Sequence, residues 1–140
     1  MTVIRLALLL ALTFSAPAFA QKAKGEAKET PPAAAIEEKP APYDTRLERL
    51  SEILGAVHYL RNLCLDEQED GWRASMQRLI ALEAANEPKR QEKLTAAFNR
   101  GYRSFAAIYT ACTDSAVVAE ERYRNEGATL ATEITARFGN

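Results

Sequence analysis

The chain has 140 residues, of which 18 are basic and 19 acidic, and its formal net charge is −1. This balance argues against nucleic-acid binding, which uses concentrated positive charge along one face of a domain. It also argues against a polybasic membrane-binding patch.

The first twenty residues have the three parts of a secretory signal peptide. Arg5 supplies the charged region, residues 6–12 form an apolar core, and small residues flank a cleavage point after Ala20. The apolar core is shorter than the roughly 20 residues of a membrane-spanning helix, so we prefer cleavage to a membrane anchor. We therefore expect export to the periplasm, with no anchor left after cleavage. The mature chain would keep 17 basic and 19 acidic residues, a net charge of −2.

Residues 21–42 are mostly Lys, Glu, Ala and Pro, and their charges cancel. Such a segment buries too little apolar surface to offset the entropy cost of ordering. It is predicted to be a disordered linker, with a peptide-recognition arm as the alternative. Residues 43–140 then form one small domain.

The first predicted helix runs from Asp44 or Thr45 to Cys64. Thr45–Glu48 has the form of a capping box, with Asp44 as the other candidate cap. Apolar side chains recur at helical spacing on one face, and three more widen it: Leu47, Leu50, Leu54, Val57 and Cys64, with Ile53, Leu60 and Leu63. Gly55 lies in this helix and would allow a neighbouring helix to approach closely.

The second predicted helix follows Asp70 as its cap and ends near Asn86. Its inward face is short, and consists of Trp72, Met76, Leu79, Ile80 and Glu83. Pro88 then starts the third helix, because proline is tolerated at the first helical position but not in a helix interior.

The third predicted helix has the clearest amphipathic pattern and is expected to end at Cys112. Its inward arc contains Leu94, Phe98, Gly101, Tyr102, Phe105, Ile108, Tyr109 and Cys112. Asn99, Arg100 and Arg103 lie on the opposite face, with Ala96 and Thr110. Thr113–Ser115 would cap a fourth helix, whose inward face contains Ala116, Glu120, Tyr123, Gly127, Leu130, Ile134 and Phe138.

Four helices with short connections predict an all-α, up-down four-helix bundle. In this topology the first and third helices are parallel, so Cys64 and Cys112 reach the same end of the bundle. In an oxidising compartment we expect them to form a disulfide. The alternatives are a redox pair, which usually has C-x-x-C spacing, and a metal site, which needs further ligands.

Arg61 and Glu120 both fall on core faces near the disulfide end. We expect them to form a buried ion pair, because an unpaired buried charge is costly. The alternative is that this pair binds a ligand.

His58 is the only histidine of the chain, so it cannot build a zinc site alone. A His58–Met76 pair could ligate haem, but a structural histidine is the preferred interpretation. Residues 66–71 resemble the start of a calcium loop, yet Gln77 stands where the bidentate Glu is needed. We therefore predict no metal, no cofactor and no catalytic residue.

Asn99, Arg100 and Arg103 are the best candidates for a partner surface, because arginine makes bidentate contacts with carboxylates. The alternative is a solvated face, as on most charged helices.

Several segments together resemble a known family of small exported alphaproteobacterial proteins of unknown function. They are residues 43–55 and 58–64, Trp72–Arg73, residues 98–105 and Cys112–Thr113. The resemblance implies two separated cysteines that bond, and it supplies no activity, ligand or catalytic residue.

The sequence thus favours a non-enzymatic periplasmic protein that acts as an adaptor for another periplasmic or envelope protein. The alternative is a small-molecule or metal binder with a pocket at the disulfide end, near Tyr59, Arg61, Tyr109 and Glu120.

Overall fold

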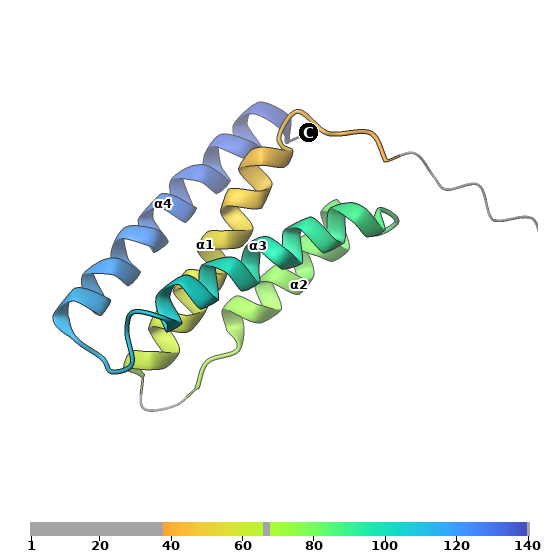
Figure 1. Ribbon diagram of the computed structural model, residues 1–140. Helices are drawn as coiled ribbons and strands as arrows, with labels where there is room; N and C mark the ends of the chain where they lie inside the picture. Colours follow the sequence, from red (N-terminus) through yellow and green to blue (C-terminus); the bar gives the residue numbers. More distant parts are fainter. Residues whose placement is uncertain (1–37, 66–67, 140) are drawn as a thin grey trace, which may run out of the picture. The chain divides into compact units, whose positions relative to one another are not determined.

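The computed structural model describes residues 38–65 and 68–139 (Figure 1). Its four α-helices are α1 (Asp44–Cys64), α2 (Gly71–Glu83), α3 (Pro88–Ala106) and α4 (Asp114–Phe138). The described residues contain no strand, so the all-α prediction is confirmed. No helix in these two ranges is long and apolar enough to cross a membrane. The predicted signal peptide, its cleavage at Ala20 and residues 21–37 of the predicted linker lie outside the described ranges.

The helices alternate in direction, as the short connections predict. The end of α4 returns to the start of α1, where the rings of Tyr43 and Phe138 lie 5.3 Å apart. The start of α3 also lies at this end, since Arg90 pairs with Asp44 at 3.1 Å. At the other end of the molecule, the disulfide joins Cys64, the last residue of α1, to Cys112 in the α3–α4 connection.

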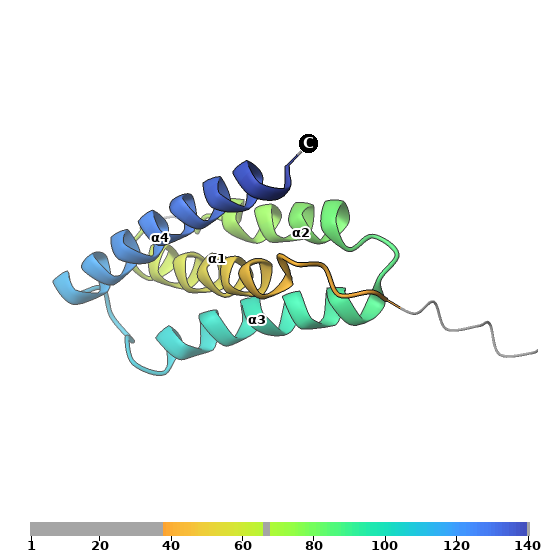
Figure 2. The same cartoon turned by 90° about the horizontal axis from the view of Figure 1, so that it is seen from above.

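The arrangement differs from a bundle of four equivalent helices because α1 lies in the centre. Figure 2 shows α3 on one side of α1, with α2 and α4 on the other. Within the described residues α4 packs mainly against α1, with one ring contact to α3 between Tyr123 and Phe105, and α2 touches α3 only lightly. Every residue from Ile53 to His58 is consequently buried. The single core stripe predicted for this helix is therefore too narrow, since three neighbours surround it.

Two glycines let α1 and α3 cross at close range. A Cβ atom on Gly55 would overlap the carbonyl oxygen of Phe98, and one on Gly101 would overlap that of Glu52. Both obstructions are backbone atoms, which cannot rotate away as a side chain can. The expected close approach at Gly55 is confirmed, and Gly101 makes it reciprocal.

The helix ends agree with the sequence in part. Pro88 begins α3, and the Thr113 hydroxyl accepts a hydrogen bond from the Ala116 amide at 3.3 Å to cap α4. Asp70 occupies the cap position of α2 without a side-chain cap bond. The predicted capping box of α1 is wrong, because α1 begins at Asp44 and no side chain caps it. The Asp44 carboxylate accepts instead from the Ala41 amide at 2.9 Å.

The prediction that α3 continues to Cys112 is also wrong. The helix ends at Ala106, and Ile108 is 71% exposed rather than inward-facing. Beyond their crossing α3 diverges from α1 (Figure 2), so the chain must turn back for Cys112 to reach Cys64. The Tyr59 hydroxyl donates to the Tyr109 carbonyl and holds this returning loop on α1.

Candidate functional site

The two cysteines form the disulfide that the sequence predicted. Cys64 and Cys112 are bonded, with their Cα atoms 4.9 Å apart, and they lie 48 positions apart in the sequence. The predicted disulfide is therefore present. It ties the start of α4 to the end of α1, the helix against which α4 mainly packs.

Arg61 and Glu120 lie close together beside the disulfide. Arg61 Nη1 is 3.6 Å from Glu120 Oε1, and Arg61 Nε makes a closer contact of 3.0 Å with Glu69 Oε2. Glu120 also lies 3.4 Å from Arg124 Nε. The Glu69 hydrogen bond raises the pKa of Arg61, which burial alone would lower. The side chain of Glu120 is 14% exposed and that of Arg61 33%, so the carboxylate is the more buried partner.

A small cavity of about 110 Å³ opens between the disulfide and this ion pair. Its walls include Leu60, Arg61, Leu65, Val117 and Glu120. Pockets for small organic ligands usually enclose roughly 300–1,000 Å³, so this cavity is small for such a ligand. Tyr59 and Tyr109, which the sequence placed here, are joined by their hydrogen bond and do not line it.

His58 lies on α1, is 4% exposed, and faces Arg73 of α2 and Phe98 of α3. Its Nδ1 lies 3.1 Å from Asn62 Nδ2, and its Nε2 lies 3.4 Å from Arg73 Nη2. The Asn62 amide is oriented by the backbone of Glu69, which donates to Oδ1 and accepts from Nδ2. Both ring nitrogens therefore face N–H donors. Burial, followed by the charge of Arg73, lowers the pKa of His58.

This environment bears on the haem and metal alternatives. A haem ligand needs a ring nitrogen free to coordinate iron, whereas both nitrogens of His58 face donors. Met76 is buried in a hydrophobic cluster with Phe98. In the segment that resembles a calcium loop, residues 66–67 lie outside the described ranges, Glu69 pairs with Arg61 and Asp70 with Arg73. The described part of the chain holds no group of three His, Cys, Asp or Glu arranged for a metal.

The structure places the three predicted partner residues on α3, but they are not equally exposed. Arg100 and Arg103 are exposed, and Asn99 is half-buried. Asn99 instead lines a cleft between α2 and α3, together with Arg73 and Phe98. Arg100 Nη2 lies 3.8 Å from Glu52 Oε2, with the arginine side chain 55% exposed.

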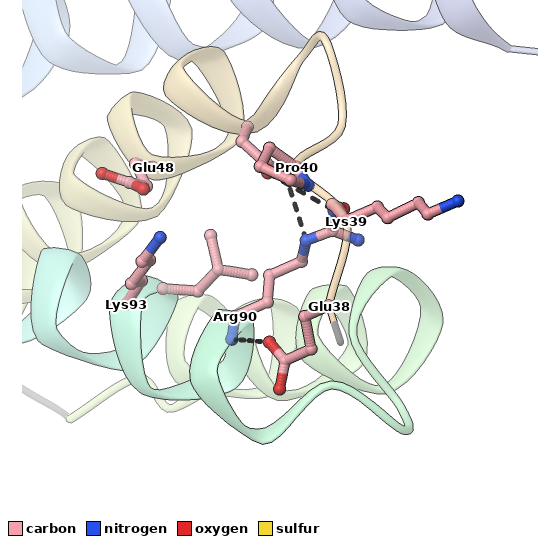
Figure 3. Close-up of a pocket in the computed structure, with 8 residues that line it drawn as sticks. Glu38, Lys39, Pro40, Glu48, Arg90 and Lys93 are labelled. Carbon is pink, nitrogen blue, oxygen red and sulfur yellow. Dashed lines mark hydrogen bonds and ion pairs between the residues drawn. The ribbon is translucent and has the colours of Figure 1, made fainter. Parts of the chain in front are cut away.

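Glu38 and Lys39, near the end of the predicted linker, contact the start of α3 (Figure 3). The Glu38 carboxylate accepts from the backbone amides of Lys89 and Arg90, both at 2.9 Å. These amides have no partner within their own helix, so Glu38 caps α3 from a distant segment. The cavity beside Glu38 and Arg90 is about 40 Å³, room for at most a few waters at roughly 10–15 Å³ each.

A larger cavity of about 320 Å³ lies between α2 and α4, with α1 as its floor. Its apolar lining comes from Leu50, Ile53 and Leu54 of α1, Trp72 and Leu79 of α2, and Ala128 and Ala131 of α4. We call this the α2–α4 groove. Among the described residues that line it, Arg124 alone carries a charge. The groove is open because α2 and α4 make no helix–helix contact in the described part of the chain.

The family described as "Protein of unknown function (DUF2385)" matches residues 42–138. The chain belongs to this family. No curated protein and no solved structure matches it significantly. Membership in an uncharacterised family is thereby confirmed, while export and taxonomic range stay predictions.

The α2–α4 groove of this DUF2385 protein was missed from the sequence. Its α1 residues, with Trp72, Leu79 and Gly127, were assigned to inward faces, whereas Ser75, Arg124, Ala128 and Ala131 were not. A signal was nevertheless present: the inward face of the second helix is short, and Gly127 and two alanines replace large side chains on the fourth. Two such faces cannot fill the space over α1 between them.

Proposed function

We propose that this DUF2385 protein is a non-enzymatic binding module of the periplasm, which attaches to an acidic surface of another cell-envelope protein. The observation that carries the proposal is the charge of α3. This helix has five basic residues and one acidic residue, whereas the whole chain is nearly neutral. This helix is thus strongly basic within a chain whose charges nearly cancel.

The basic side chains of α3 form a stripe along its exposed face. Lys89, Lys93, Arg100 and Arg103 recur at intervals that keep them on one side of a helix, and all four are exposed. We call them the α3 basic stripe. It contains two of the three residues that the sequence singled out. Complementary charge of this kind steers association and sets specificity more than it adds affinity.

A binding role suits the reactive groups of the chain better than a catalytic one. Cys64 and Cys112 are consumed in the disulfide. His58 is buried with both ring nitrogens facing donors, so it is poorly placed to take a proton from a substrate. The signal peptide predicted at residues 1–20 and the disulfide both support a periplasmic location.

The test is crosslinking in the periplasm with tagged protein, followed by mass spectrometry of the proteins that co-purify. The variant Arg100→Glu/Arg103→Glu reverses two charges of the α3 basic stripe. The control variant Arg78→Glu/Arg122→Glu changes net charge equally at exposed positions of α2 and α4. We expect a reproducible envelope partner that the stripe variant loses and the control keeps. Circular dichroism checks that both remain folded.

Equal recovery of the partner by both variants would refute the α3 basic stripe as the interface. Binding of purified protein to anionic vesicles, with no protein partner recovered, would replace the adaptor role with membrane attachment.

A further inference from the structure

We propose that the α2–α4 groove binds an anionic amphiphile, a molecule with an apolar chain and one negatively charged head group. The groove lies between α2 and α4, which Figure 2 shows on the opposite side of α1 from α3, the helix that carries the α3 basic stripe. The two sites are therefore separate. The inference therefore does not depend on the proposed adaptor role.

The size and lining of the groove favour an apolar chain. Its volume of about 320 Å³ falls within the range of small-molecule pockets, roughly 300–1,000 Å³. Leu50 and Leu54 form the floor, and Trp72 and Leu79 form one wall. Water in contact with such a surface is released when an apolar chain covers it, which favours binding.

The small residues on the α4 wall create this space. Gly127 must lack a side chain, because a Cβ atom there would lie 2.9 Å from Ile53 Cγ2. Ala128 and Ala131 contribute only methyl groups to the wall. In the described part of the chain no helix contact joins α2 and α4, so a ligand can enter between them without breaking one.

The charge at the groove favours an anionic head group. Arg124 is 45% exposed, and its Nε atom lies 3.4 Å from Glu120 Oε1. Glu120 is shared with Arg61, so its single negative charge is divided between two guanidinium groups. Among the described residues the terminal nitrogens of Arg124 donate no hydrogen bond, which leaves them for a carboxylate or phosphate oxygen.

Trp72 provides a direct readout, because it lines the groove and is the only tryptophan of the chain. The probe is dodecanoate below its micelle concentration, titrated into the mature protein while Trp72 fluorescence is recorded. Dodecan-1-ol has the same chain without the charge. We expect saturable binding of dodecanoate and weaker binding of the alcohol.

Three variants locate the site. Ala128→Phe fills the groove and should abolish binding, whereas Ala136→Phe makes the same change at an exposed position of α4 outside the groove and should preserve it. Arg124→Gln should weaken dodecanoate binding about threefold to tenfold and leave dodecan-1-ol unaffected, as expected for a partly exposed charged contact. Arg100→Glu/Arg103→Glu should bind dodecanoate as the unaltered protein does.

Several results would overturn the proposal. One is the absence of any saturable change in Trp72 fluorescence when dodecanoate is added. The same result is expected if the groove binds a helix of a partner protein. Another is equal loss of binding in Ala128→Phe and Ala136→Phe. A response to vesicles of anionic phosphatidylglycerol without a response to monomeric dodecanoate would show membrane binding instead.

Discussion

The buried side chain of His58 makes the stability of the fold depend on pH. Its ring lies 5.9 Å from that of Phe98 and 6.0 Å from that of Tyr102, measured between centroids. The Arg73 guanidinium lies 3.4 Å from the ring at Nε2 and can only donate to it. A protonated His58 would place a second positive charge beside Arg73 in a buried position, a cost that the nearby Asp70 and Glu69 only partly offset. The folded state therefore favours the neutral ring.

The first prediction concerns pH. Because folding lowers the pKa of His58 below its usual value of 6.5, the unfolded chain binds the proton more readily. Stability is fully present above about pH 6.5 and decreases as pH falls, by up to about 1.4 kcal/mol per pH unit until the folded pKa is reached. Urea unfolding measured between pH 7.5 and 5.5 should show this loss.

His58→Gln supplies the control, because the chain has no other histidine. Its stability should be nearly constant over the same pH range. A loss of equal slope in this variant would assign the effect to other groups.

At the scale of elements, the packing of α1 against α3 depends on backbone contact. At Gly55 and Gly101 each helix lies against a carbonyl group of the other. The close approach brings Ala56 and Ala97 into full burial. Larger residues around the crossing would separate the helices and open gaps between them.

The second prediction tests this crossing. Gly55→Ala or Gly101→Ala should destabilise the protein by about 1–3 kcal/mol, since overpacking forces backbone shifts. This loss exceeds the roughly 0.5–1 kcal/mol that alanine gains over glycine within a helix. Chemical denaturation of purified variants measures it.

Gly71→Ala is the matched control for the crossing. Its Cβ would lie 3.3 Å from a flexible Glu69 side-chain oxygen rather than from backbone, so little destabilisation is expected. If all three variants have the same stability, the crossing is not limited by backbone contact.

Helix α4 is attached to α1 by a bidentate ion pair. Arg49 Nε and Nη2 donate to the two carboxylate oxygens of Glu126 at 2.8 and 2.9 Å, and the Arg49 guanidinium stacks 5.2 Å from the Tyr123 ring centre. This bidentate contact raises the pKa of Arg49 further above its usual value. Together with the disulfide, it holds a helix whose apolar residues are mostly only half-buried.

At the scale of the whole molecule, the disulfide restricts the unfolded chain. The third prediction is that Cys64→Ser/Cys112→Ser lowers the free energy of unfolding by about 4 kcal/mol, the chain-entropy estimate for closing a loop of this length. Differential scanning calorimetry under non-reducing conditions measures the change. The reduced wild-type protein should have the same melting temperature as the double variant. If its melting temperature equals that of the oxidised protein instead, the bond contributes little to stability.

The fourth prediction concerns where the folded domain begins. Glu38→Ala removes the carboxylate that caps α3 and should cost about 1 kcal/mol, as loss of a capping side chain usually does. Lys39→Ala is the control, because residue 39 contributes its backbone carbonyl to Arg90 rather than a side-chain contact. Thermal denaturation of both variants makes the comparison. Equal melting temperatures would show that the domain does not depend on Glu38.

The sequence predicted the local features better than the global ones. Periodicity identified four helices, proline and threonine marked two helix starts, and topology brought the cysteines together. It could not show that α1 is central, because a residue such as Ser51 is buried only through its neighbours, with its hydroxyl bonded to the Leu47 carbonyl. The groove depends on the space between two helices, which no single helical pattern encodes.

The central position of α1 has a consequence for synthesis. The chain leaves the ribosome from its N-terminus, so α1 emerges before every helix that covers it. Its middle turns, buried in the final structure, stay partly uncovered after α2 has emerged, until α3 and α4 follow. Exposed apolar surface of this kind is prone to aggregate and is the usual target of chaperones. The helix that organises the fold is thus also the segment that most needs protection before folding is complete.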